Sequence, residues 1–150
     1  MRLYFDTSVL GALTDRHDER RLAATRELLR AVRNAVHEAV ISNVVQEELE
    51  RAPADVRRSI IGEIRDIEFD LVTESVESAG LVTEYLAAKI VPPRYSNDLR
   101  HVAVATVHRV DALVSWNFKH LVNLRTRRAV HAINLRLGFP LLEIVSPEVV

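Results

Sequence analysis

The alternation of apolar and polar positions predicts short strands separated by helices along the whole chain. Residues 2–5 form an apolar run typical of a buried strand, and residues 40–41 and 112–116 predict two further strands. Between residues 67 and 72, apolar and acidic side chains alternate, which predicts another strand. A last strand is expected at residues 141–145.

Helices are predicted between these strands, where apolar residues recur three or four positions apart. Caps and breakers mark several of their ends, because Ser and Asn cap helix N-termini well and Pro interrupts a helix interior. The predicted helices run from Leu22 to Val36, from a cap at Ser42 or Asn43, from Pro53 through Ile64, from about Ser75 to Ile90, from a cap at Ser96 or Asn97 to about Arg109, and through Val130 to Gly138. This alternation indicates an α/β fold with a mostly parallel sheet and helices on both faces.

The ends of the predicted strands are the first places to look for chemistry. In parallel sheets, ligands bind beyond the carboxyl ends of the strands. Asp6 and Asn117 lie at those positions, and a predicted helix starts there after Ser42.

Composition narrows the range of functions. The chain has 150 residues, 48% of them hydrophobic, which predicts one domain over residues 1–150. It has no Cys, so disulfides, thiol nucleophiles, Cys-based zinc sites and iron–sulfur clusters are excluded, and a reducing cytoplasm is the expected location. No apolar run approaches the ~20 residues of a membrane span, and Asp6 interrupts the opening segment as a signal sequence. Any chemistry must therefore use oxygen or imidazole groups.

Charge is nearly balanced overall but unevenly distributed. The formal net charge is −1, yet residues 1–46 carry +1, residues 47–84 carry −7 and residues 85–150 carry +5. All basic residues except Lys89 and Lys119 are Arg, which favours forked contacts with phosphate or carboxylate. The C-terminal segment is therefore either a local basic face for an anionic partner or an ordinary solvated surface.

Asp6 and Glu48 are two candidate acids at the same edge of the predicted sheet. Asp6 ends a buried strand and is followed by Thr7 and Ser8. A carboxylate beside two hydroxyls can bind a cation, although a single Asp there also serves to cap the following turn. Glu48 lies six residues after Ser42 in a short acidic run, and such runs also form ordinary solvated helix surface.

Asp98 and His101 lie one turn apart at the start of another predicted helix. An acid at a helix start is stabilised by the helix dipole, and a half-buried histidine can have a structural hydrogen bond, so each also has a structural explanation. Further along, polar residues gather after a buried strand, among them Asn117, Lys119 and His120. Asn is also a common turn former.

Bringing the three acids to one edge of the sheet has a chemical consequence. Carboxylates brought to one edge of a sheet repel one another unless a cation lies among them. All-oxygen ligation suits Mg²⁺ or Mn²⁺, which lower the pKa of a bound water and stabilise the oxygens of a phosphodiester during hydrolysis. The sequence therefore predicts that Asp6, Glu48 and Asp98 meet at a divalent-metal site.

Four segments carry a resemblance to a known family. They are Leu-Tyr-Phe-Asp-Thr-Ser-Val at residues 3–9, Ile-Ser-Asn-Val-Val-Gln-Glu-Glu-Leu at 41–49, Asn-Asp-Leu-Arg-His-Val-Ala-Val-Ala at 97–105, and Asp-Ala-Leu-Val-Ser-Trp-Asn-Phe-Lys-His-Leu-Val-Asn at 111–123. In this order they resemble the motifs of PIN domains, and more narrowly those of the VapC-like toxins of type II toxin–antitoxin systems and their stand-alone relatives.

The resemblance implies a three-layer α/β/α sandwich and a Mg²⁺- or Mn²⁺-dependent endoribonuclease. Glu48 is preferred to Glu47 because the motif places its acid six residues after the Ser and directly before a Leu. The matching residues are Asp6, Glu48 and Asp98 as metal-binding acids, Thr7 or Ser8 as an auxiliary hydroxyl, and His101 as a companion of Asp98. Many members have a fourth acid where this chain has Asn117, whose amide can ligate a metal or position a water but adds no charge.

The resemblance also implies an RNA substrate, a homodimer and a cognate antitoxin that covers the acidic site. Candidates for contacts with RNA phosphates are Arg94, Arg100, Lys119 and Arg125, all in the basic C-terminal segment. Two other functions stay open. Asn117 also suits a stand-alone or non-cleaving PIN protein that only binds nucleic acid, and Asp6 with Lys119 suits a receiver-like domain phosphorylated on the Asp.

Overall fold

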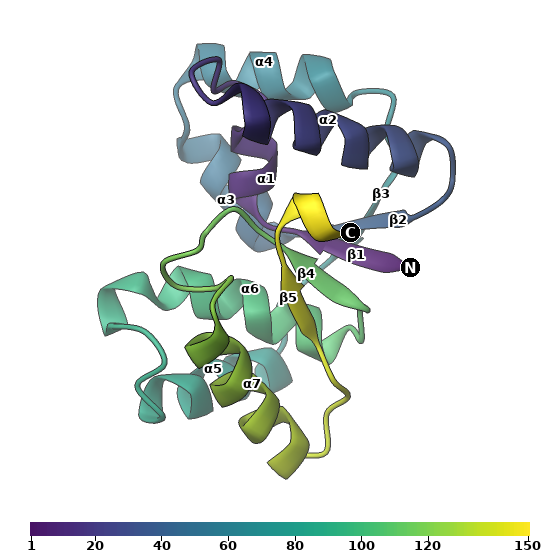
Figure 1. The fold of residues 1–150 in the computed structure, drawn as a ribbon. Helices are drawn as coiled ribbons and strands as arrows, with labels where there is room; N and C mark the ends of the chain where they lie inside the picture. The colour runs from purple at the N-terminus through teal and green to yellow at the C-terminus, as the bar shows by residue number, and fades with distance from the viewer.

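The computed structural model describes residues 1–150, and a sheet of five parallel strands lies at its centre (Figure 1). The strands lie side by side in the order β3-β2-β1-β4-β5. In chain order they are β1 (Arg2–Phe5), β2 (Glu38–Ser42), β3 (Phe69–Val72), β4 (Ala112–Val114) and β5 (Glu143–Val145). Every neighbouring pair is parallel, which confirms the predicted kind of sheet.

The strand order reverses its direction between β1 and β4. From β1 the chain moves outward to β2 and β3, then returns across the sheet to β4 and moves outward on the other side to β5. Because parallel connections are right-handed, the two halves of the chain place their helices on opposite faces. The carboxyl ends of β1 and β4 are therefore the topological switch point, where ligands bind in open α/β sheets.

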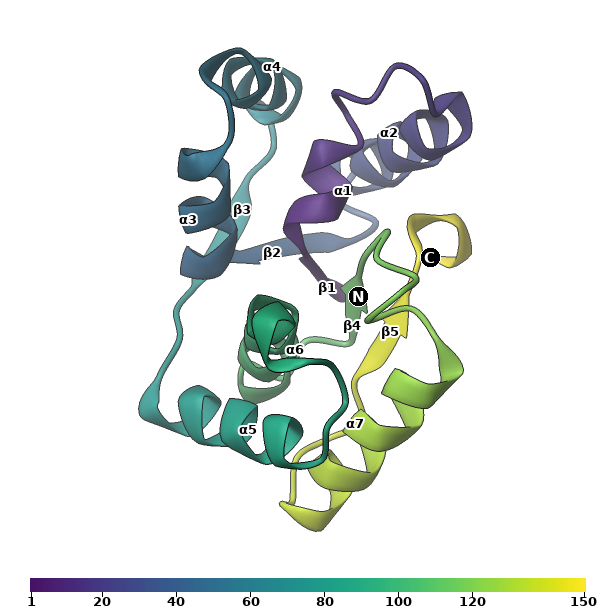
Figure 2. The same ribbon diagram turned by 90° about the vertical axis from the view of Figure 1, so that its left-hand side faces the viewer.

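Seven helices cover the sheet in two layers. Helices α1, α2 and α4 lie over one face and α5, α6 and α7 over the other (Figures 1 and 2). Helix α3 contacts both α1 and α6, so it joins the layers near the carboxyl edge. The bounds are α1 (Thr7–Gly11), α2 (Glu19–Arg33), α3 (Asn43–Arg51), α4 (Ala54–Ile64), α5 (Val76–Ala87), α6 (Ser96–Val107) and α7 (Leu124–Arg136), with 3₁₀ turns at Pro93–Tyr95 and Pro147–Val149. The predicted three-layer sandwich is confirmed.

Side-chain caps start several helices at the carboxyl edge. The Asp6 carboxylate caps α1, and the Ser42 hydroxyl caps α3, as predicted for Ser42. The predicted cap at Ser96 or Asn97 is wrong. Helix α6 continues directly from a 3₁₀ turn and begins after Tyr95, which provides no side-chain cap.

The hydrophobic pattern is misleading at the rim of the molecule. Val36, predicted in a helix, follows the end of α2 and is exposed, and Ile61 on α4 is also exposed. Leu71, predicted on the buried face of a strand, is 48% exposed because β3 is an edge strand. Helix α1 was not predicted, because five residues are too few to show a helical period.

The core is one cluster of 34 buried residues on both faces of the sheet. Leu3, Tyr4 and Phe5 are fully buried, as expected of a central parallel strand. Leu113 and Val114 of the neighbouring β4 are also fully buried. None of the helices combines the length and the apolar character that a bilayer crossing needs. The two strands that end at the switch point, β1 and β4, are thus almost entirely buried in the core.

Arg100 joins three parts of the chain near the carboxyl edge. Its guanidinium donates to both carboxylate oxygens of Glu74, at 2.7 and 2.6 Å, and to Glu47 at 3.1 Å. The Asn43 amide also donates to Glu74, at 2.9 Å. The Arg100 guanidinium holds the pKa of the Glu74 carboxyl below its usual value. These bonds fasten α3 and α6 to the segment after β3. The Arg100 guanidinium, predicted as a contact for RNA phosphates, is therefore already bound to carboxylates of the protein.

The Glu74 pair predicts a pH-dependent contribution to stability. Glu74→Gln should lower the free energy of unfolding at pH 7 by about 1 kcal/mol, because a forked ion pair is lost. A depressed carboxyl pKa stabilises the fold above the usual value of 4.5, and this stabilisation is lost as the pH falls through the depressed value. Urea denaturation of both proteins across this pH range measures the difference, which should shrink in acid.

Glu84→Gln is the matched control for this measurement. Glu84 makes a single ion pair with Arg136, and both side chains are exposed. Its loss should change the free energy of unfolding by only a few tenths of a kcal/mol. An equal effect of the two substitutions would contradict the special role of the Arg100 network.

Candidate active site

The switch point gathers polar side chains from both halves of the chain. Asp6 directly follows β1, and Ser115 and Asn117 directly follow β4. Glu48 lies on α3, which starts where β2 ends, and Asp98 lies in the first turn of α6. The structure thus brings four positions predicted from the sequence to one edge of the sheet.

The Asp6 carboxylate is buried and held by two hydroxyl groups. Ser8 Oγ donates to Oδ1 at 2.5 Å and Ser115 Oγ donates to Oδ2 at 2.5 Å, while the Val9 N–H donates to Oδ1 at 3.3 Å. Only 4% of the residue is exposed. Burial raises the pKa of Asp6, although the His101 charge and the two hydroxyls oppose this rise. Asp6 therefore has a fixed orientation, and its carboxylate is held by hydrogen bonds without an ion pair.

The same hydroxyls also fix the backbone after β4. Ser8 Oγ accepts the Trp116 N–H at 2.8 Å, and Ser115 Oγ accepts the Asn117 N–H at 2.9 Å. Each serine therefore bonds at once to Asp6 and to the loop that carries Asn117. Ser115 was not among the predicted site residues, and the only sequence signal for it was a polar residue at the end of an apolar strand.

Glu48 lies at one end of a chain of hydrogen bonds through the core. His101 Nε2 is 2.5 Å from Glu48 Oε1, and His101 Nδ1 is 2.7 Å from the Tyr4 hydroxyl. The Tyr4 hydroxyl in turn lies 2.7 Å from Ser42 Oγ. A hydrogen on His101 Nε2 donates to the Glu48 carboxylate, while His101 Nδ1 shares a hydrogen bond with the Tyr4 hydroxyl. The chain therefore orients the Glu48 carboxylate from the interior.

This chain also sets the charge state of Glu48. Burial alone would raise the pKa of the Glu48 carboxyl, but the hydrogen bond and charge of His101, with a smaller contribution from the charge of Arg100, lower it overall. Burial raises the pKa of the Tyr4 hydroxyl, which therefore stays protonated. His101 was predicted to accompany Asp98. It accompanies Glu48 instead, because its side chain points from α6 toward α3 rather than along its own helix.

Asp98 has a different histidine as its partner. His120 Nδ1 lies 2.8 Å from Asp98 Oδ2, and the His120 ring packs against Tyr95. The Asn117 side-chain oxygen accepts the His120 backbone N–H at 3.0 Å. Asn117 therefore shapes the turn that presents His120 to Asp98, as a turn-forming Asn does.

The three acids reach one edge but do not converge on a single point. The structure contains no group of three or more His, Asp or Glu side chains placed to hold a metal ion. The predicted meeting of all three at one ion is therefore not seen in the side-chain positions. Like charges repel, and each carboxylate has a hydroxyl or imidazole partner of its own.

The donors nevertheless fit a hard cation in their chemistry. The acids and Asn117 offer only oxygen atoms, and Mg²⁺ commonly takes one or two protein carboxylates together with waters and substrate phosphates. His101 acts on both Asp6 and Glu48, because its charge lowers the pKa of each carboxyl. The hydroxyl of Thr7, the residue after Asp6, is buried without a hydrogen-bond partner. An unpartnered buried hydroxyl is a place where an ion or water is expected.

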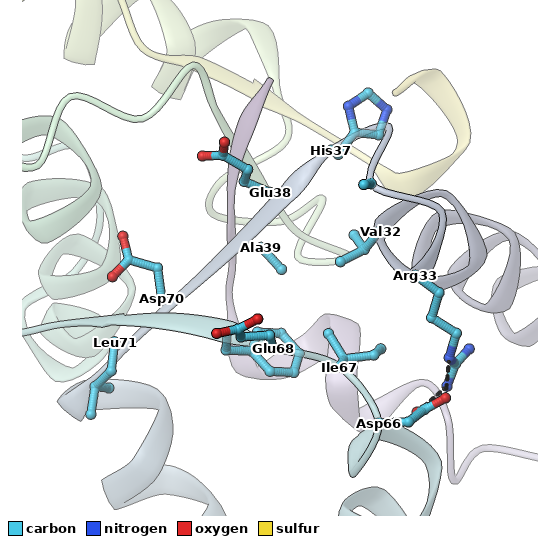
Figure 3. Close-up of a pocket in the computed structure, with 12 residues that line it drawn as sticks. Val32, Arg33, His37, Glu38, Ala39, Asp66, Ile67, Glu68, Asp70 and Leu71 are labelled. Carbon is cyan, nitrogen blue, oxygen red and sulfur yellow. Dashed lines mark hydrogen bonds and ion pairs between the residues drawn. The ribbon is translucent and has the colours of Figure 1, made fainter.

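A large hollow on the surface lies away from these acids. It has a volume of about 770 Å³ and surrounds the amino-terminal ends of β2 and β3. Figure 3 shows Glu38, Glu68 and Asp70 around it, with Arg33 and Asp66 paired at one side. Because ligands of parallel sheets bind at the carboxyl ends of strands, this hollow is not the candidate active site.

Comparison with known proteins bears on the fold. No protein-family model matches the chain, and no curated protein matches it. A chain in the crystal structure of VapBC2 from Rickettsia felis bound to a DNA fragment from their promoter is similar to it, with a TM-score of 0.59 and 15% sequence identity. The match covers 97% of this chain and 98% of that chain. The chain therefore has the α/β/α fold that its resemblance to VapC-like PIN domains implies.

Proposed function

We propose that this protein is a Mg²⁺-dependent endoribonuclease of the VapC-like PIN type. The observation that carries the proposal is the placement of Asp6, Glu48 and Asp98, from three separate elements, at the topological switch point of a parallel sheet. The fold shared with the VapBC2 chain supports it as well.

The acids are proposed to hold the metal with Asn117 as a neutral oxygen ligand. Mn²⁺ has the same preference for oxygen donors and can replace Mg²⁺. When bound, such an ion lowers the pKa of a water and stabilises the attacking and leaving oxygens of a phosphodiester.

The chain's own residues prepare this site before any ligand binds. Two hydroxyls fix Asp6, His101 fixes Glu48 and His120 fixes Asp98. Groups that orient a metal-binding carboxylate commonly change metal affinity or activity by about 10- to 100-fold. Asn117 contributes no charge, so the electrostatic attraction for the ion comes from the three carboxylates.

We further propose a protein partner for this chain. The similar structure is of VapBC2 bound to a DNA fragment from their promoter, which supports an antitoxin as the partner. That the antitoxin covers the acids is expected from the resemblance to VapC-like toxins. A homodimer is also expected from the resemblance to VapC-like toxins. Co-expression with the product of an adjacent small gene, followed by size-exclusion chromatography, measures both assemblies.

Glu48 and its neighbour Glu47 provide a matched test of the nuclease. Glu48→Gln should reduce Mg²⁺-dependent cleavage of single-stranded RNA by about 100-fold, because a proposed metal ligand loses its charge. Glu47→Gln should cleave at close to the wild-type rate, since Glu47 pairs with Arg100 and not with the site. Initial cleavage rates on labelled RNA, with and without EDTA, measure both.

Two results would contradict this assignment. One is full cleavage by Glu48→Gln with a melting temperature like that of the wild type. The other is RNA binding by the wild type without turnover in Mg²⁺ or Mn²⁺, which would favour the non-cleaving alternative.

Asp6→Asn should separate stability from activity. Burial raises the pKa of Asp6, so the ionised carboxyl destabilises the fold increasingly as the pH rises above the usual value of 3.8. The amide keeps the shape without the charge, and Ser115 Oγ can accept its N–H if the Ser115 hydroxyl hydrogen turns to Ser8 Oγ, 3.3 Å away. At pH 7, Asp6→Asn should therefore raise the melting temperature by about 2–4 °C while abolishing cleavage. Thermal denaturation and the RNA assay measure the two effects.

Added Mn²⁺ tests in the same two proteins whether Asp6 holds the metal. It should raise the melting temperature of the wild type, because a ligand that binds only the folded state stabilises it, and it should leave Asp6→Asn unchanged. An equal Mn²⁺ effect on both proteins would place the ion elsewhere.

A further inference from the structure

Tyr95 is surrounded by basic side chains at the start of α6. Its ring centroid lies 4.1 Å from that of His120, with an interplanar angle of 47°. The Arg94 guanidinium carbon lies 4.9 Å and the Lys119 Nζ 5.8 Å from the Tyr95 centroid. These side chains come from the 3₁₀ turn before α6 and the loop after β4, so the fold assembles the cluster from two distant segments.

Arg94 and Lys119 are not used by the fold. Both residues are exposed, and neither side chain makes an ion pair or a hydrogen bond within the protein. Arg100, by contrast, is bound to two carboxylates. The charges of Arg94 and Lys119 are therefore available to an anionic ligand, and cation–π attraction to Tyr95 keeps them beside one aromatic ring.

The two segments are held in place before a ligand binds. Pro92 and Pro93 restrict the backbone that leads into Tyr95. On the other side, the His120 backbone N–H donates to Asn117 at 3.0 Å, and its carbonyl accepts from the Thr126 hydroxyl at 2.7 Å. A preorganised ring with adjacent cations loses little entropy when it binds a ligand.

We infer that Tyr95, Arg94 and Lys119 form a binding site for one nucleotide of single-stranded RNA. The base stacks on the Arg94 guanidinium, which lies over the Tyr95 ring, and Lys119 contacts an adjacent phosphate. Aromatic rings combined with cations bind unpaired bases in this way, because a base inside a duplex has no free face. The inference rests on the proposed function for its substrate class.

His120 connects this nucleotide site to the candidate active site. The His120 ring contacts Tyr95, and its Nδ1 contacts Asp98. A nucleotide on Tyr95 therefore lies next to the acids, and the neighbouring phosphodiester is the one they can reach. Removing the ring should weaken RNA binding, and so raise KM, more than it lowers kcat.

RNA binding in the absence of metal tests the site directly. The probe is a short fluorescein-labelled single-stranded oligoadenylate, titrated in EDTA so that no cleavage occurs, with fluorescence anisotropy as the readout. Tyr95→Leu should weaken binding about tenfold, as expected for loss of one stacked base, and Tyr95→Phe should keep it. The Arg94→Gln/Lys119→Gln double variant should also weaken binding, and it should reduce the salt dependence by about one phosphate contact, that of Lys119.

Arg58→Gln is a control for the loss of one positive charge away from the site. Arg58 is an exposed arginine on α4, on the opposite face of the sheet, and it makes no ion pair. It should bind the probe as the wild type does. Because Tyr95 packs partly against the core, the double variant of two exposed residues keeps the test valid if Tyr95→Leu fails to fold.

The outcomes separate this inference from the proposed nuclease. Unchanged binding by both the Tyr95→Leu and the double variant, or no binding of oligoadenylate by the wild type, overturns the nucleotide site. An equal loss in Arg58→Gln also overturns it, since binding would then be nonspecific. If Tyr95-dependent binding is found but the wild type does not cleave in Mg²⁺ or Mn²⁺, the nucleotide site stands and the nuclease proposal fails.

Discussion

A buried carboxylate between two strands is the constraint on which the site depends. Asp6 has little contact with solvent, and burying an unpaired charge is costly, so its oxygens need donors from the protein. Ser8 and Ser115 supply them, and the same hydroxyls accept backbone N–H groups of the loop after β4. The position of Asp6 and the path of that loop are therefore one hydrogen-bonded unit. A change in either serine would disturb both the fold at the switch point and the acid.

The other two acids follow the same principle with imidazole donors. Glu48 on α3 is held by His101 on α6, and Asp98 on α6 is held by His120 from the loop after β4. Each acid is thus oriented by a residue from a different element, which couples the geometry of the site to the packing of the helices. The Tyr4 hydroxyl extends this coupling to the central strand. The orientation of Glu48 and Asp98 therefore depends on tertiary contacts rather than on local turns.

The difference between local and tertiary contacts explains what could be predicted from the sequence. Buried parallel strands are short apolar runs with polar ends, so the strands, the Ser42 cap and the placement of Asp6 after β1 were predictable. The partner of Glu48 was not, because it depends on how α3 and α6 lie against each other, and the two residues are 53 positions apart. The exposed Leu71 was also missed, since an edge strand and an interior strand have similar local sequences.

The ion pairs explain the uneven distribution of charge along the chain. Acids of the negative segment at residues 47–84 are paired with arginines from both flanks, for example Glu74 with Arg100, Glu63 with Arg26 and Asp66 with Arg33. The acidic segment therefore serves largely as internal counter-charge. Cations left without such partners, Arg94 and Lys119 among them, lie around Tyr95, whose ring packs against the His120 that binds Asp98. A net charge near zero conceals this separation, and so it does not argue against an anionic polymer as the ligand.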